Sequence, residues 1–366
     1  MYAIPHQYID RQSGVVQTEP LYHDTLVNFF YSGLWERAPV LYNLLTRAWT
    51  SQLLSFINYD LPVGARLSGA TRFLRTCRVN FSECVEPLER LRTARAIFER
   101  KIRYWECRPL PEDSQMIVSP ADCRLLVGSL RGASHLFLKW KFFDFDELFG
   151  RDKLCWSRTF HGGDFAICRL TPEKYHYNHM PVAGVMRDHY EIPGGYASCN
   201  PGVVVTLVTP YSKNKRIVTI IDTDVEGGSQ VGLVAMIEVV ALMIGDITQC
   251  DSSEGYDNPQ PVMPGLFLRR GAPKSLYRPG SSTTIVFFQA GRVEFAADLV
   301  RNMHRQHVHS RFSHGFGRPL VETDVKVRSA IAKAIPLPSV KQRTLWRSLF
   351  GKGGWQRQED YLTPKW

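Results

Sequence analysis

From about residue 114 onward, the chain consists of short β-branched and apolar runs separated by Gly, Pro, Asn and Asp. Such runs, bounded by turn-forming residues, are typical of β-strands. The pattern predicts a domain of antiparallel or mixed β-sheets over 111–335, with strands at 116–128, 164–170, 202–208, 216–223, 231–243 and 284–288. Only 144–149 has a clear helical pattern there, because Asp144 and Glu147 are spaced as an N-cap and its partner.

The residues before this β domain have helical periodicity. Pro39 suits the first turn of a helix over 39–57 with an apolar face, and 88–105 combines apolar residues on one face with arginines on the other. The predicted fold class is therefore α+β, with an amphipathic, membrane-associating helical region over 1–110 and the β-rich domain after it. Two interpretations of the 39–57 helix stay open: it packs on the protein core, or it lies in the plane of a bilayer.

Composition and charge limit the class of partner. Hydrophobic residues make up 44% and charged residues 22% of the chain, as in globular proteins. Forty-five Lys and Arg against 35 Asp and Glu give a charge of +10, which favours an anionic partner such as phospholipid headgroups or nucleic acid. A basic-aromatic tail over 336–366 is expected to be disordered in solution.

The expected cellular compartment rests on the absence of a membrane-spanning stretch, of a signal peptide and of paired cysteines. No stretch reaches the roughly 18 consecutive apolar residues of a spanning helix, and the first residues lack the apolar core of a signal peptide. The eight cysteines form no CxxC pair, which indicates reduced thiols. We expect a peripheral protein at the cytoplasmic face of the cell membrane.

Four segments of the β region carry chemically useful side chains: an Asp on a turn at 119–122, two His three residues apart in 175–181, the pair Asn200-Pro201 with 214–216, and the run 280–283. Each is a weak signal alone. Asp, His and Ser together are the parts of an activated nucleophile, because the carboxylate orients the imidazole and the imidazole takes the hydroxyl proton. The sequence does not show that they meet in space.

Residues 8 to 320 resemble the phosphatidylserine decarboxylase family, in its prokaryotic type. The matching blocks follow the order of the family: 8–11 (YIDR), 98–101 (FERK) before Arg108-Pro109, 119–122 (SPAD), Gly162-Gly163 with Arg169-Leu170, 175–181 (YHYNHMP), Asn200-Pro201, 214–216 (NKR) and 280–283 (GSST). Linked blocks in one order over some 300 residues are specific in a way that no single block is.

The resemblance implies a self-processing proenzyme in which Asp122, His179 and Ser281 form a charge relay. Ser281 Oγ would attack the Gly280 carbonyl, and elimination of the resulting ester would leave dehydroalanine, which hydrolyses to a pyruvoyl group with loss of ammonia. This covalent pyruvate cofactor would form a Schiff base with phosphatidylserine and release CO2, giving phosphatidylethanolamine, so the enzyme would be a carboxy-lyase of phospholipid biosynthesis. His176 is the candidate acid or base for decarboxylation.

The implied products are a β chain of residues 1–280 and an α chain of residues 281–366. The implied partners are phosphatidylserine, an anionic membrane surface and the two chains for each other; a homodimer is compatible, and nucleic acid is not expected. No metal is expected, because His304, His307 and His309 lack nearby carboxylates and cysteines. The alternatives are a pyruvoyl-dependent decarboxylase of a free amino acid and a non-enzymatic protein that binds membrane or nucleic acid.

Overall fold

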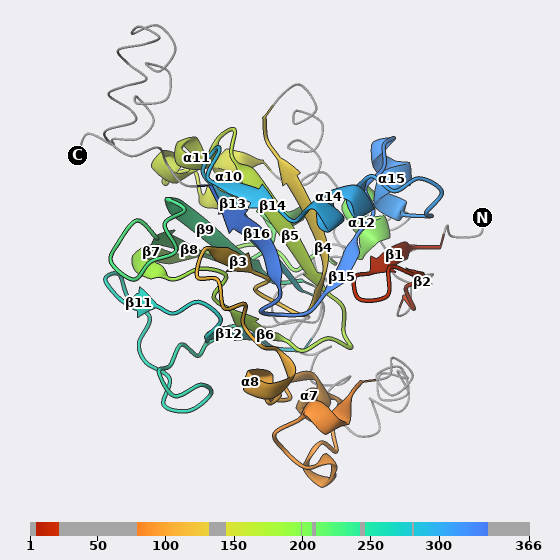
Figure 1. The fold of residues 1–366 in the computed structure, drawn as a ribbon, viewed down its shortest axis with the longest axis horizontal. Coiled ribbons are helices and arrows are strands. Elements are labelled where there is room, and N and C mark those ends of the chain that lie inside the picture. Colours follow the sequence, from red (N-terminus) through yellow and green to blue (C-terminus); the bar gives the residue numbers. More distant parts are fainter. Residues whose placement is uncertain are drawn as a thin grey trace, which may run out of the picture.

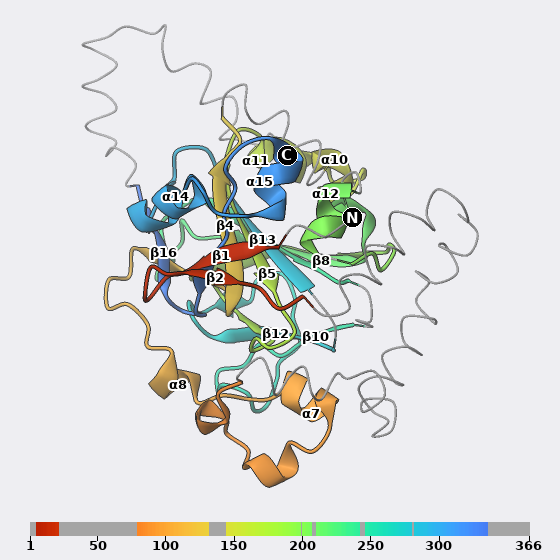
Figure 2. The same ribbon diagram turned by 90° about the vertical axis from the view of Figure 1, so that its right-hand side faces the viewer.

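The structure is a computed structural model, which describes residues 5–21, 79–131, 144–198, 200–206, 210–241, 246–279 and 282–335. Its centre is a ten-stranded mixed sheet in the order β11-β7-β8-β9-β13-β5-β4-β15-β1-β2 (Figures 1 and 2). Neighbouring strands are antiparallel except β1 and β15, which are parallel. The strands are β1 (Gln7–Asp10), β2 (Val16–Thr18), β4 (Cys123–Ser129), β5 (Asp164–Leu170), β7 (Gly184–Ile192), β8 (Arg216–Asp222), β9 (Leu233–Val239), β11 (Phe267–Leu268), β13 (Ser282–Phe288) and β15 (Thr323–Val325).

Two three-stranded sheets complete the β structure. One has the order β10-β12-β6 and the other β14-β16-β3. Their strands are β3 (Met116–Val118), β6 (Tyr177–His179), β10 (Ile247–Gln249), β12 (Pro273–Tyr277), β14 (Val293–Phe295) and β16 (Ala330–Ala334). Because β12 leads directly towards β13, the first small sheet is joined to the middle of the large one.

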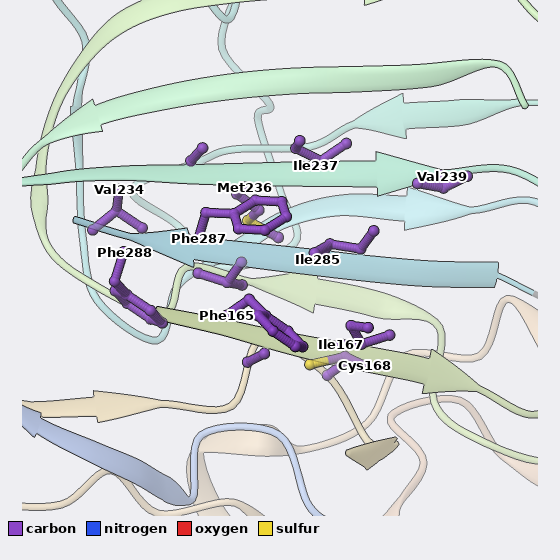
Figure 3. Packing of buried hydrophobic residues seen from close by; sticks show 14 of the residues in the cluster. Phe165, Ile167, Cys168, Val234, Met236, Ile237, Val239, Ile285, Phe287 and Phe288 are labelled. Atoms are coloured by element: carbon purple, nitrogen blue, oxygen red, sulfur yellow. The ribbon is translucent and has the colours of Figure 1, made fainter. Parts of the chain in front are cut away.

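The core lies around β13, which is buried at all seven positions. Ile285 pairs with Ile167 on β5 and with Ile237 on β9, and Phe287 packs with Phe165 and its neighbours (Figure 3). A strand that pairs on both sides and is buried on both faces needs apolar, β-branched and aromatic residues in succession. The segment after the predicted cleavage site is thus fixed in the centre of the protein.

The sequence-based strand predictions match β3 and β4, β5, β8, β9 and β13, and the helix prediction at 144–149 is confirmed. Helix α10 spans Phe145–Phe149, and the Asp144 side chain accepts a 2.9 Å hydrogen bond from the Glu147 N–H, as the N-cap spacing requires. The fold class is α+β in the structure too, with the mixed sheet as its main element.

The predicted strand at 202–208 is wrong, because α12 spans Pro201–Thr206. Its valines have high β propensity, but Pro201 favours the first turn of a helix and the Asn200 side chain accepts a hydrogen bond from the Gly202 N–H. Other helices of the β-rich part were not predicted: α11 (Leu154–Phe160), α13 (Pro210–Lys213), α14 (Ala297–Met303) and α15 (Arg311–Phe316).

The helical structure predicted for 1–110 differs from the structure in two places. β1 and β2 lie in the first 20 residues and belong to the large sheet, so 1–110 is not wholly helical. The expected helix over 88–105 is broken into η4 (Leu88–Arg90), α7 (Ala94–Phe98) and α8 (Tyr104–Cys107), preceded by η3 (Phe81–Glu83). The Thr93 side chain caps α7 by accepting from the Ala96 N–H, which begins a new helix inside the predicted one.

Several predictions fall on residues outside the described ranges. They concern the helix at 39–57 and the neighbouring part of the region 1–110, the tail 336–366 and the cleavage pair Gly280-Ser281. Within the described residues, no helix has the length and apolar character needed to cross a membrane.

Candidate active site

The candidate site lies where the small sheet β10-β12-β6 meets the start of β13, between the large sheet and the α7–α8 segment (Figures 1 and 2). Tyr277, the last residue of β12, donates from its backbone N–H to the His176 carbonyl at 3.1 Å. Its hydroxyl donates to the Thr283 carbonyl at 3.0 Å, and so ties the end of β12 to the start of β13. In the sequence, Gly280 and Ser281 stand between these two anchored strands, outside the described residues.

His176 is fully buried, and its ring makes a stacking contact but no hydrogen bond to a described residue. Its ring stacks on Phe98 with centroids 3.5 Å apart, and neither ring nitrogen has a hydrogen-bond partner among the described residues. Burial, together with the charge of Arg100, holds the pKa of this imidazole well below its usual value, so it is neutral at physiological pH. A buried polar group without a partner is uncommon and is a mark of a functional site.

Two hydroxyls next to the predicted cleavage site share this property. Ser282 Oγ and Thr283 Oγ1 are buried and have no hydrogen-bond partner among the described residues. Like the His176 nitrogens, they are buried polar atoms without a partner, and both belong to the first two residues after residue 281 in the chain. A small polar group formed at residue 281, with a ketone and an amide oxygen, fits these unused donors and acceptors.

His179, in contrast, is held on both sides. Nδ1 is 2.8 Å from the Gly271 carbonyl, so it carries the proton, and Nε2 accepts from the Tyr175 hydroxyl at 2.9 Å. Burial lowers the pKa of His179 to about 3. Gly271 has a φ of +75°, and a Cβ there would press on Leu110, so the turn that presents its carbonyl requires glycine.

Asp122 is buried beside these histidines but does not bond to them. The His179 N–H donates to the Pro120 carbonyl at 2.7 Å, which places the Asp122 turn next to β6. The carboxylate of Asp122 instead accepts from Arg108 Nε and Nη2 at 3.1 and 2.8 Å and from the Val327 N–H at 2.7 Å. Burial raises the pKa of Asp122, but the charge of Arg108 outweighs it and the pKa is lowered.

The structure therefore departs from the simple relay that the resemblance implied. Asp122, His176 and His179 lie in one region, but no hydrogen bond joins Asp122 to His179 in the described part of the chain. Through space, the charge of Asp122 favours the protonated imidazole of His179, while the charges of Arg328 and Arg108 oppose it, and burial keeps the pKa of His179 low. Sequence reasoning missed the roles of Arg108 and Tyr175, although both stand inside the blocks 108–109 and 175–181 that carried the resemblance.

A cavity of about 310 Å³ opens beside Asp122. Its wall includes residues from the chain start, from the segment before β3, and from the loops around β6 and β15. Charged side chains of both signs dominate this wall: Asp10, Arg11, Glu83, Arg100, Arg108, Asp122, Glu173, Lys174, Asp324 and Lys326. A small zwitterionic or anionic group would meet complementary charge here.

One group of possible metal ligands lies elsewhere, at His6, Glu19 and Glu322. Arg169 fills the space between them, because its Nη2 is 2.6 Å from an oxygen of each glutamate. A guanidinium at that position compensates the carboxylates and would repel a dication. The cluster is therefore a buried ion network that joins the chain start to β5 and β15.

The fold and the site are those of an enzyme domain, in which two buried, uncharged histidines lie beside the end of β12 in a β-rich core. A family model described as phosphatidylserine decarboxylase matches residues 94–312, and the chain belongs to this family. It is 31% identical over 294 residues to the phosphatidylserine decarboxylase proenzyme of Chlamydia trachomatis, covering 80% of this chain and 90% of that protein.

Two further relatives show the same relationship at greater distance. The proenzyme of Fusobacterium nucleatum is 25% identical over 297 residues, with 81% of this chain and 91% of the relative covered. The proenzyme 3 of Schizosaccharomyces pombe is 26% identical over 298 residues, which is 80% of this chain and 29% of that longer protein.

Proposed function

We propose that the chain is a phosphatidylserine decarboxylase proenzyme that cleaves itself between Gly280 and Ser281 and then converts phosphatidylserine to phosphatidylethanolamine and CO2. Family membership and relatives named as proenzymes support the activity and the dependence on a pyruvoyl group. The observation that carries the assignment to these residues is His176. Neither nitrogen of its buried imidazole has a partner among the described residues, and its carbonyl accepts from Tyr277 at the end of the strand that precedes the cleavage pair.

Self-cleavage requires the Ser281 hydroxyl to lose its proton as Oγ attacks the Gly280 carbonyl. His179 is the proposed base, because the Gly271 carbonyl holds the proton on Nδ1 and leaves the Nε2 lone pair as acceptor. The Tyr175 hydroxyl now occupies that lone pair, so Ser281 either displaces it or passes its proton through it. Asp122 supports the imidazolium that forms by its negative charge, while Arg108 fixes the position of that charge.

For the lipid reaction, the pyruvoyl group supplies an electrophilic carbonyl and an electron sink for the bond that releases CO2. The chain itself must manage protons and exclude water. His176 can take up a proton on either nitrogen and return it to the carbon that has lost CO2, because no described residue occupies those nitrogens. The stack on Phe98 fixes the imidazole plane and covers it from solvent.

Intact-mass analysis of the purified protein under denaturing conditions tests the proposal. We expect two chains of about 32 and about 10 kDa, from division of the 41.8 kDa chain in proportion to lengths of 280 and 86 of its 366 residues. The shorter chain should resist Edman degradation, because a keto group replaces its amine. CO2 should be released from phosphatidylserine in detergent and not from free serine. Active protein with one uncut chain would contradict the proposal.

We further propose that the enzyme binds the membrane surface peripherally through its basic, amphipathic N-terminal segment, whose residues 22–78 lie outside the described ranges. Each Lys or Arg near an anionic surface contributes up to about 1 kcal/mol of attraction, which salt screens. The protein should sediment with phosphatidylserine vesicles and be partly released by high salt.

The double variant Leu45→Glu with Trp49→Glu should weaken that sedimentation and leave the 280/281 cleavage intact, because both residues fall on the predicted apolar face. Asn43→Glu with Thr50→Glu is the matched control, since it adds the same charge on the predicted polar face. Normal vesicle binding by the first variant, or its failure to fold and cleave, would instead place this segment in the protein core.

A further inference from the structure

Arg100 is a buried cation without a carboxylate partner. Its Nη1 donates to the Ile97 carbonyl at 2.9 Å and its Nη2 to the Glu173 carbonyl at 2.8 Å. In the described part of the chain, no carboxylate oxygen lies within ion-pair distance of this guanidinium, although only 6% of the residue is exposed. Removing a cation from water without a counter-charge costs several kcal/mol, so such a residue calls for an explanation beyond packing.

The other cationic side chains that line the 310 Å³ cavity are either paired with a carboxylate or exposed. Arg11, Arg108 and Lys174 each form an ion pair with a carboxylate, and Lys326 is exposed to solvent. Among the described residues that line the cavity, Arg100 is therefore the buried cation that forms no ion pair, and the carboxylates of Asp122, Glu173 and Glu83 act on it only from a distance.

Arg100 also borders the reacting region. Phe98, two residues before it, stacks on His176, and the Glu173 carbonyl that it binds lies three residues before His176 in the chain. The charge of Arg100 acts on the His176 ring directly. An anion bound by Arg100 in the cavity would thus lie beside the segment that leads to the proposed catalytic histidine.

We propose that Arg100 binds the phosphodiester of the lipid headgroup and so determines that the substrate is a phosphorylated serine rather than the free amino acid. This inference rests on the proposed function and extends it to substrate recognition. Guanidinium groups bind phosphate through two parallel N–H···O bonds, and such charge-assisted bonds are roughly twice as strong as neutral ones.

The phosphate is the better ligand of the two anions of phosphatidylserine because of what happens in the reaction. The carboxylate loses its charge as CO2 departs, so an ion pair to it would stabilise the ground state more than the transition state. The phosphodiester keeps its charge throughout. An ion pair to it therefore strengthens substrate binding without slowing the chemical step.

The test compares Arg100→Gln with Arg90→Gln, which removes an exposed arginine from the same segment. Both proteins are taken after cleavage, which reports that they have folded. In detergent micelles, Arg100→Gln should raise the KM for phosphatidylserine about tenfold or more and change kcat less than about threefold. Arg90→Gln should change neither. A fall in kcat at unchanged KM would overturn the inference.

Binding of soluble headgroups separates phosphate from carboxylate. Calorimetry with glycerophosphoethanolamine, which has the phosphodiester but no carboxylate, should show binding to the wild-type enzyme that is lost in Arg100→Gln. Loss of glycerophosphoserine binding with unchanged glycerophosphoethanolamine binding would assign Arg100 to the carboxylate and overturn the inference.

If Arg100→Gln does not cleave itself, Arg100→Lys replaces it in the test, because lysine keeps the positive charge but cannot form two parallel hydrogen bonds. It should mature and bind glycerophosphoethanolamine about three- to tenfold more weakly than the wild type. Unchanged KM and binding in Arg100→Lys would mean a structural role. Failure of the proposed function would be seen separately, as absence of CO2 release from phosphatidylserine by wild-type enzyme.

Discussion

Ser281→Ala should give a single uncut chain of 41.8 kDa with no decarboxylase activity. Alanine offers no oxygen to attack the Gly280 carbonyl, so neither the ester nor the keto group can form, and the loss is complete rather than partial. Mass spectrometry under denaturing conditions measures the cleavage, and release of labelled CO2 from carboxyl-labelled phosphatidylserine measures the activity. The uncut protein should still fold, because the core around β13 does not depend on this hydroxyl.

Ser282→Ala is the matched control. This neighbouring serine is buried, begins β13 and has no hydrogen-bond partner for its Oγ among the described residues. Its removal therefore breaks no bond, and cleavage should proceed. Cleavage of Ser281→Ala, or its loss in Ser282→Ala alone, would place the scissile bond one residue later than proposed.

The strands that form the core could be predicted because their sequence signal is local. Fully buried runs such as Ile285–Phe288 consist of β-branched and aromatic residues, and turn-forming residues delimit them. Helix α10 was predictable for the same reason, since its cap is encoded three residues apart. The failure at 202–208 shows the limit: a valine run satisfies strand propensity, while one Pro and one Asn at its start decide for a helix.

The candidate residues could be identified from the sequence, and their roles stay predictions; their bonds could not be predicted. Asp122, His176 and His179 were found through short blocks, and they do meet around the β6–β12 pair. The partners of Asp122 depend on Arg108, which is 14 residues away, and those of His179 on Gly271, which is 92 residues away. Such contacts follow from the sheet order, which the sequence does not encode locally. The unpaired state of Arg100 could be recognised only after every neighbouring carboxylate had been placed.

The two histidines should separate maturation from turnover. His179→Ala removes the proposed base, so the chain should remain uncut over hours. His176→Ala should cleave at close to the wild-type rate but turn over phosphatidylserine about 10²- to 10⁴-fold more slowly, the usual range for the loss of a general acid or base. His189→Ala, a half-buried histidine on β7 outside the site, is the control and should affect neither step.

This separation follows from the geometry of the two rings. His179 has both nitrogens engaged by Gly271 and Tyr175, as suits a base held in one tautomer for a single event on its own chain. Neither His176 nitrogen has a hydrogen-bond partner among the residues that the structure describes, as repeated proton transfer to successive substrates requires. If His176→Ala stays uncut while His179→Ala matures, the roles must be exchanged. If both variants mature and turn over normally, neither histidine carries the proton, and Tyr175, which bonds to His179, becomes the candidate to examine.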